Sequence, residues 1–193
     1  MKIKISFFTI MLILSLILSS SFYALIPLIA ATLHELGHIS AARARKVTLR
    51  KFDVELFGAR LSMDNTLCSY TDEITICAAG PLTNLIFAYL VKSVTSHFKI
   101  ESPAFEIFIF SSISLAIINL LPIRSFDGGR ILCAVISNFL NPPKAERIIG
   151  LLSFFFLFTL WCVSVYLLLK TSASLSLFIF SSYLFINLFV KSP

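Results

Sequence analysis

The chain is 193 residues long; hydrophobic types make up 58% of it and charged types only 13%. This charged share is about half of the ~25% found in ordinary soluble domains, so the composition excludes a water-soluble globular protein. The net charge of +6 is compatible with nucleic-acid binding, but the basic residues flank apolar stretches, as they do in membrane proteins. We therefore expect an integral, multi-pass membrane protein in a lipid bilayer, with no nucleic-acid partner.

Six apolar stretches predict an all-α polytopic membrane protein with about six transmembrane helices. Most of them approach the ~20 residues needed to cross the hydrocarbon core of a bilayer. The first stretch, which follows Lys2 and Lys4, is also compatible with a cleaved signal peptide. We favour an uncleaved span, because the next apolar stretch follows almost at once. In chain order, the predicted spans are 5–20, 22–42, 74–91, 105–123, 148–169 and 174–190.

Two polar connections separate these stretches. The longer one, 43–73, follows the second span and alternates apolar and polar residues over 47–61, which predicts a small β-hairpin or sheet. The other, 124–147, contains a short apolar piece, 131–140, which we expect to be an interfacial or partly inserted helix. Because neither connection has room for a second soluble domain, we expect residues 1–193 to form a single membrane-embedded domain without a PDZ or nucleotide-binding domain.

The distribution of positive charge predicts the orientation of the spans. With the N-terminus inside, 13 of the 16 lysines and arginines lie on the cytosolic side, and only Lys92, Lys99 and Lys170 lie on the other. Cytosolic connections of membrane proteins carry such an excess of basic residues. An even number of spans returns the chain to its starting side, so both termini are predicted to be cytosolic.

The second predicted span, 22–42, contains the sequence His-Glu-Leu-Gly-His at 34–38. Residues four apart on a helix share a face, so His34 and His38 can occupy two tetrahedral positions on one zinc ion. Glu35 is adjacent to His34 and can reach a water molecule at the metal without binding the metal itself. In that place a carboxylate acts first as general base and then as proton donor to the leaving amine.

A His-Glu-x-x-His pattern often arises by chance in soluble proteins. Here a chance origin is disfavoured, because ionisable groups are costly inside hydrocarbon and mark functional sites. Gly37, inside the pattern, is expected to leave room beside the helix backbone for metal or substrate. His97 lies in a predicted external connection, where we expect a solvated loop residue rather than a ligand. Of the three histidines, only His34 and His38 are therefore predicted to bind a metal.

Two histidines leave a catalytic zinc site one protein ligand short. The segment 119–129 offers a candidate, because Pro122 breaks the fourth predicted span and Gly128-Gly129 allows a sharp turn. Broken helices at membrane depth occur where they are buried or line a wet cavity. Asp127 in this segment is either a carboxylate ligand or the N-cap of a helix over 128–140, and the pattern leaves both roles open.

Three separated motifs carry a resemblance to a known family. They are the histidine motif at 34–38, Ala-Gly-Pro-Leu-Thr-Asn at 79–84, and Asn-Leu-Leu-Pro at 119–122 followed by Asp-Gly-Gly-Arg at 127–130. In order and in their assignment to spans, they resemble the site-2 protease family of intramembrane zinc metalloproteases. The likeness covers roughly residues 20–135 and is greatest to the compact bacterial branch that includes stage IV sporulation protein FB.

This resemblance implies one zinc ion per chain, with Asp127 as the third ligand and Glu35 as the catalytic acid and base. It suggests that Asn119 positions substrate or the oxyanion, although an asparagine in a membrane helix also bonds neighbouring helices. Asn84 either packs the third span or contacts substrate. The implied function is hydrolysis of a peptide bond in or near a transmembrane segment of a membrane-protein substrate, in a bacterial cytoplasmic or sporulation-related membrane.

The chain departs from the family pattern just before Asp127. Members often have a second proline just before the Leu-Asp-Gly, where this chain has Ser125 and Phe126. Two other functions remain open at this point. One is a non-catalytic membrane adaptor that binds transmembrane helices; the other is a metalloprotease that cuts prenylated or soluble cytosolic peptides. The second of these does not account for the segment 119–127.

Overall fold

The structure is a computed structural model, and it describes residues 2–5, 22–47, 49–55, 58–63, 69–171 and 175–190. The chain divides into two compact units, 1–120 and 121–193. The predicted single domain over 1–193 stays a prediction. Most of the predicted first span, 6–20, lies outside the described residues.

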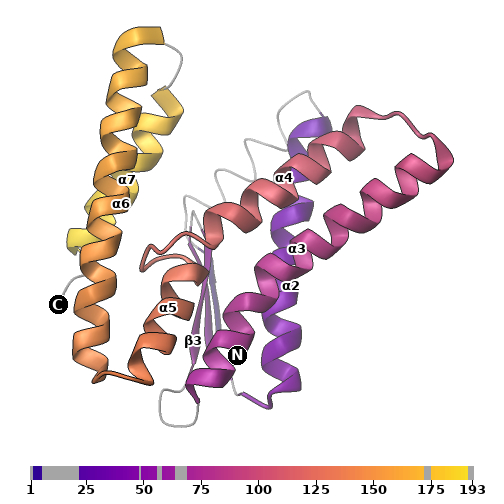
Figure 1. Cartoon of the computed structure of the whole chain (residues 1–193). Coiled ribbons are helices and arrows are strands. Elements are labelled where there is room, and N and C mark those ends of the chain that lie inside the picture. Colours follow the sequence, from indigo (N-terminus) through magenta and orange to yellow (C-terminus); the bar gives the residue numbers. More distant parts are fainter. Residues whose placement is uncertain are drawn as a thin grey trace. The chain divides into compact units, whose positions relative to one another are not determined.

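The first unit is built on helix α2, which runs Ile26–Ala44 (Figure 1). The short 3-10 helix η1, Phe22–Leu25, leads into it, and a proline in the first turn suits the backbone angles needed there. Its buried residues recur every three or four positions and therefore form one face of the helix. These buried residues are Ile26, Ala30, His34, Gly37, His38 and Ala42.

Helix α3, Tyr70–Phe98, is longer than the predicted span at 74–91. It begins with a capping box, in which the Ser69 N–H donates to the Asp72 carboxylate over 3.4 Å. Lys99, directly after its last residue, adopts the left-handed conformation that closes many helices. Because the apolar stretch sets only the middle of this helix, the sequence prediction missed both polar ends.

Helix α4, Pro103–Asn119, ends four residues before the predicted end of the fourth span, 105–123. The physical reason is Pro122, which has no N–H and disfavours a helical conformation in the residue before it. Helices α2, α3 and α4 all contact one another, as Figure 1 shows. The three helices form the framework of this unit.

A side-chain contact joins the end of α2 to the start of α3. The Arg45 guanidinium lies 3.4 Å from the Asp72 carboxylate and donates to the Thr75 hydroxyl over 3.1 Å. Because both Arg45 and its partners are partly exposed, this ion pair contributes little to the free energy of unfolding. Its effect is to hold together the two ends of the long polar connection.

Three short strands belong to the same unit, and only their backbone is described. They are β1 (Lys2–Ile5), β2 (Leu49–Glu55) and β3 (Gly58–Met63). Strand β2 is central; it pairs parallel with β1 and antiparallel with β3. The side chains of this region lie outside the description, so the hairpin predicted over 47–61 and its role stay predictions.

The second unit contains helices α5 (Asp127–Ser137), α6 (Pro142–Thr171) and α7 (Leu175–Val190). Helix α6 contacts both α5 and α7 (Figure 1). Helix α5 begins four residues earlier than the predicted piece at 131–140, because Asp127 and the two glycines after it are already helical. A small apolar core, Ile123, Phe126, Leu157 and Leu184, holds the unit together.

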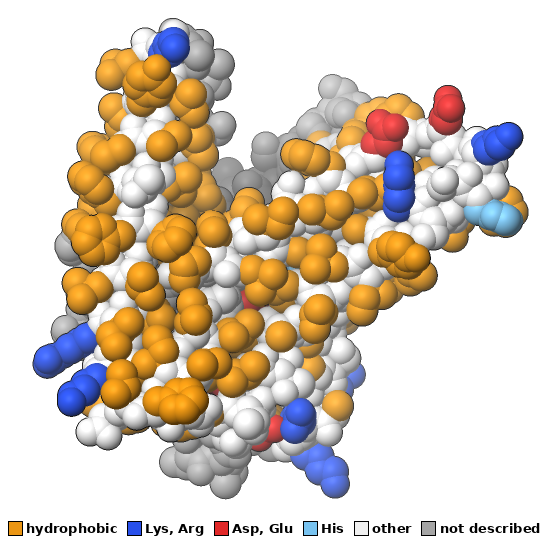
Figure 2. All heavy atoms as spheres, viewed as in Figure 1, with side chains coloured by type: hydrophobic (Ala, Val, Ile, Leu, Met, Phe, Trp, Pro, Cys, Tyr) orange, Lys and Arg blue, Asp and Glu red, His pale blue; other side chains and the backbone are white. Residues whose placement is uncertain are grey.

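Within the described residues, three helices are long and apolar enough to cross a membrane: Tyr23–Ala44, Tyr70–Phe98 and Pro142–Lys170. Pro103–Asn119 and Leu177–Ile186 are shorter apolar helices. Figure 2 shows hydrophobic side chains along the lengths of the helices and most charged side chains near helix ends. Exposing so much apolar surface to water would be strongly unfavourable. Helices thus stand where the second to sixth spans were predicted, and the crossing of a membrane by all of them stays a prediction.

Candidate metal centre

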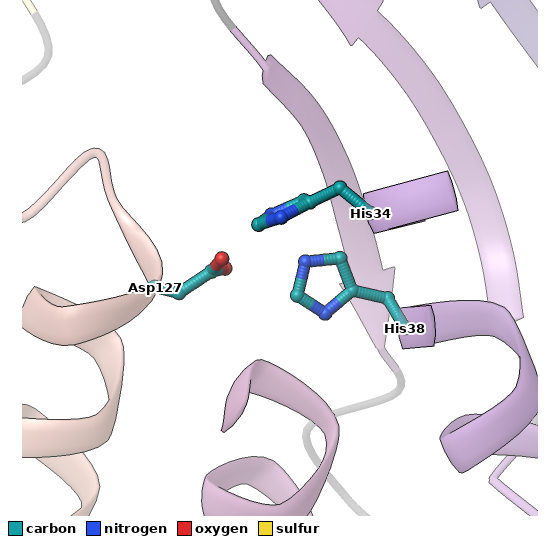
Figure 3. Close-up of side chains that lie close together, drawn as sticks. All are labelled: His34, His38 and Asp127. Atoms are coloured by element: carbon teal, nitrogen blue, oxygen red, sulfur yellow. The ribbon is translucent and has the colours of Figure 1, made fainter. Parts of the chain in front are cut away.

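His34 and His38 lie one turn apart on the buried face of α2. Each imidazole is only 4% exposed. Their ring centroids are 4.8 Å apart, and the rings meet edge to face at 83°. Figure 3 shows both rings projecting from α2, and it shows the Asp127 carboxylate at the beginning of α5. The spacing of four residues therefore gives two adjacent imidazoles, as it does on any regular helix.

A backbone carbonyl of α3 fixes the ring of His38. Its Nδ1 atom lies 2.7 Å from the Ile76 carbonyl oxygen, and both groups are buried. A carbonyl oxygen can only accept a hydrogen bond, so Nδ1 is the donor and carries the proton. In the neutral ring the lone pair is then on Nε2. His38 is therefore held in the tautomer that binds a metal through Nε2.

His34 meets a side chain of α3 at the equivalent atom. Its Nδ1 lies 3.3 Å from the Nδ2 position of the Asn84 amide, and Asn84 is fully buried. Both Nδ1 atoms of the pair are therefore engaged by α3. This leaves the two Nε2 atoms as the ring nitrogens with which the pair can bind a metal.

Gly80 lies where these two Nε2 atoms come together. A Cβ atom at this position would overlap His38 Nε2 and Cε1, and it would lie 2.8 Å from His34 Nε2. Real Cβ atoms essentially never approach a heavy atom so closely. The absent side chain of Gly80 thus lets both imidazole rings lie against the backbone of α3 with their Nε2 atoms close together. Two adjacent imidazoles fit a zinc ion, for which histidine nitrogen is a common ligand.

Gly37 has a different role from the one expected. A Cβ atom there would lie 2.7 Å from the Ala79 carbonyl oxygen and would also overlap the Thr83 side chain. The space beside Gly37 is therefore occupied by α3 and holds neither metal nor substrate. Small residues at a crossing let two helix backbones approach closely, which brings the α3 groups within reach of the histidines.

Asp127 is the first residue of α5 in the second unit, and it is 9% exposed. Phe126 occupies the N-cap position, so Asp127 does not take the N-cap role that the sequence left open. The turn before it is held by two bonds: Phe126 N–H donates to the Ile123 carbonyl over 2.8 Å, and Arg124 N–H donates to the Ser153 hydroxyl over 2.8 Å. A carboxylate in the first turn also suits the helix dipole.

The remaining predicted residues lie as follows. Glu35 is half-buried on α2, next to His34. Asn119 is the last residue of α4, and its Nδ2 donates to the Leu115 carbonyl of the same helix over 3.0 Å. His97 is exposed, as expected, but it lies in the last turn of α3 rather than in a loop, and its ring contacts Phe98. The described contacts do not test the catalytic roles predicted for Glu35 and Asn119.

Sequence reasoning left one residue of this centre without a specific role. Asn84 was expected to pack the third span or to contact substrate, but it lies against His34. The spacing of Ile76, Gly80 and Asn84, four residues apart at each step, is the signal that puts them on one face of α3. The sequence does not reveal which face of α2 they meet.

Known proteins resemble the chain along most of its length. It is 29% identical over 162 residues to stage IV sporulation protein FB of Bacillus subtilis (strain 168), covering 79% of this chain and 54% of that protein. It is also 29% identical over 150 residues to a zinc metalloprotease of Methanocaldococcus jannaschii, covering 75% of this chain and 44% of that protein. The chain thus spans about half the length of these curated relatives.

Solved structures and family models agree with these relatives. The site-2 protease from Methanocaldococcus jannaschii matches with a TM-score of 0.70 over 99% of this chain and 90% of that chain; at 22% identity, the likeness shows a common fold. The model of peptidase family M50 matches residues 22–99 and 92–162, which include all three motifs. The resemblance predicted from those motifs is confirmed: the chain belongs to peptidase family M50, the site-2 protease family.

Proposed function

We propose that the chain is an intramembrane zinc metalloprotease, which hydrolyses peptide bonds in or near a transmembrane segment of a membrane-protein substrate. One observation carries the proposal: His34 and His38 are buried on α2, a helix apolar enough to span a membrane, and both Nε2 atoms adjoin Gly80. Membership of family M50 supports it, as does the name of the archaeal relative, a zinc metalloprotease.

In this proposal one zinc ion is held by His34, His38 and Asp127. The place of Asp127 in the third motif, 127–130, supports it as the third ligand. Catalytic zinc sites use three protein ligands of this kind and keep a further position open. Zinc bound there would supply Lewis-acid chemistry, polarising the scissile carbonyl and activating water.

Glu35 moves the protons in this proposal. It follows His34 directly, so it is near the metal without being needed to bind it. Its carboxylate takes a proton from the attacking water and then gives one to the leaving amine. Both transfers are needed to complete hydrolysis of an amide, because without the second proton the nitrogen would have to leave as a strongly basic amide anion.

Asn119 positions the substrate or the oxyanion in this proposal. Its amide nitrogen donates to the Leu115 carbonyl, which fixes the orientation of the side chain at the end of α4. An amide nitrogen carries two hydrogens, so a second donor is available to a substrate oxygen. An oriented donor of this kind stabilises negative charge that develops on the carbonyl oxygen.

We place both termini and the polar connection 43–73 in the cytosol, with six spans in a bacterial membrane, because this arrangement satisfies the distribution of positive charge. Cleavage is then expected toward the cytosolic side. A helical substrate hides its peptide bonds and must unwind before water can attack. The strands over 49–63 offer backbone groups that can hold an unwound segment extended by main-chain hydrogen bonds.

The proposed function is tested with the Glu35→Gln variant. Membrane proteomes of cells that express the wild type or the variant are compared, and proteins that accumulate uncut with the variant are candidate substrates. Each candidate is then incorporated with purified enzyme in liposomes. The proposal expects cleavage by the wild type and almost none by the variant. Binding of the candidates without cleavage by the wild type would overturn it and would favour a non-catalytic adaptor.

A further inference from the structure

One face of α3 provides the groups that the histidine pair contacts. Ile76, Gly80 and Asn84 are four residues apart at each step and are buried. The Ile76 carbonyl accepts from His38, the Gly80 backbone adjoins both Nε2 atoms, and the Asn84 amide meets His34. Helix α3 therefore holds both rings by their Nδ1 atoms.

The two Nδ1 atoms differ in how firmly their protonation is set. His38 faces a backbone carbonyl, which any residue at position 76 would supply and which can only accept. His34 faces a side-chain amide, which can present either its oxygen or its nitrogen. These two amide orientations are told apart by the hydrogen bonds that each permits. The tautomer of His34 therefore depends on Asn84.

Zinc binding through Nε2 of His34 requires one of these orientations. With Nδ2 toward the ring, His34 Nδ1 must accept, the ring proton sits on Nε2, and Nε2 has no lone pair for a metal. Turning the amide over directs Oδ1 at Nδ1, so that Nδ1–H donates and Nε2 becomes a ligand.

We propose that Asn84 is a positioning residue whose side-chain oxygen accepts the Nδ1–H of His34, which presents Nε2 of that ring to zinc. The inference rests on the proposed zinc site and adds a residue to it. Asn84 is fully buried, so it acts through His34 and does not touch substrate. Partners of this kind set the tautomer and orientation of metal-binding histidines.

The first measurement is zinc affinity by competition with a chelator, made on the full-length protein in detergent. Asn84→Leu keeps the approximate volume but removes the acceptor, and it should weaken zinc binding roughly 10- to 100-fold. Asn84→Asp keeps an oxygen acceptor and should bind zinc about as well as the wild type. Thr83→Val is the matched control, because the Thr83 hydroxyl donates to the Ala79 carbonyl of its own helix over 2.7 Å; it should leave zinc affinity unchanged.

The second measurement is made on the wild type and uses a variant only to assign the signals. The ring nitrogens of the metal-free wild type are labelled with ¹⁵N, and the His34 signals are assigned by comparison with His34→Ala. The proposal expects a proton on Nδ1 of His34. A His34 ring with its proton on Nε2 would overturn the proposal, whatever the variants show.

The outcomes separate this inference from the proposed function. A wild-type protein that binds no zinc would overturn both. If the wild type binds zinc, and the double variant His34→Ala/His38→Ala does not, the proposed ligands stand. Full zinc affinity in Asn84→Leu would then overturn the role of Asn84 alone. Equal weakening in Asn84→Leu and Asn84→Asp would also overturn it, because packing and not the acceptor would be responsible.

Discussion

Replacement of Gly80 by alanine is a sharp test of the histidine geometry, because two effects oppose each other there. In the interior of a helix, alanine is favoured over glycine by about 1 kcal/mol. At position 80, however, the added Cβ would overlap His38 Nε2 and lie 2.8 Å from His34 Nε2. The substitution should therefore stabilise the helix while it displaces the imidazole rings.

The size of the second effect follows from packing. Inserting a methylene-sized group into a well-packed interior costs typically 1–3 kcal/mol, unless neighbours move. In the metal-free protein the rings of His34 and His38 can move, but zinc needs Nε2 atoms near 2.0–2.1 Å and tolerates roughly 0.2 Å. To bind zinc, the Gly80→Ala variant must therefore bring both rings back to the positions at which they overlap the new Cβ. A cost of about 1–3 kcal/mol corresponds to a roughly 5- to 150-fold loss of zinc affinity.

Zinc affinity and thermal unfolding of the purified protein are measured together. Gly150→Ala is the matched control, because it makes the same substitution in α6, where a Cβ would meet nothing within 4 Å. The control should keep wild-type zinc affinity. If Gly80→Ala binds zinc as tightly as Gly150→Ala does, the two Nε2 atoms do not converge beside Gly80, and the reasoning about the centre is refuted.

Three further predictions concern the metal, the acid–base residue and the strands. The double variant His34→Ala/His38→Ala should lose its zinc in metal analysis; full retention would contradict the ligand assignment. Glu35→Gln should keep zinc but cleave roughly 10²- to 10⁴-fold more slowly, and near wild-type turnover would exclude Glu35 as the acid and base. Single prolines in the strands remove main-chain donors and should slow cleavage without loss of zinc; normal cleavage by all of them would contradict a substrate-binding strand. They are placed in turn at Leu49, Val54 and Leu61.

The parts of the fold that follow from bilayer thickness could be predicted from the sequence. Apolar stretches located helices α2, α3, α4, α6 and α7, because a helix of about 20 apolar residues matches the hydrocarbon core. Their ends depend on local chemistry outside those stretches. The capping box at Ser69 extended α3, and Pro122 ended α4 early. A hydropathy profile reflects neither the capping box nor the proline, although both can be found in the sequence.

In the metal centre, too, the sequence predicts the contacts within one helix but not those between helices. The relation of His34 to His38 depends only on helix geometry, so their spacing was sufficient to predict it. The contact between His34 and Asn84 joins residues 50 apart and depends on how α2 crosses α3. The pattern along either helix does not specify this crossing. The role of Gly37 could not be predicted for the same reason, because the space beside it is filled by α3, whose position the sequence does not specify.

The Arg45 contact has a consequence for how the chain tolerates change. Because Arg45 lies against Asp72 and Thr75, the polar connection leaves and re-enters the helices at neighbouring points. The entropy of closing a loop grows slowly, by about 0.6 kcal/mol for each doubling of its length. Extra sequence inserted between Lys46 and Ser69 therefore need not disturb α2 or α3. The length of this connection can therefore change while the histidine pair stays in place.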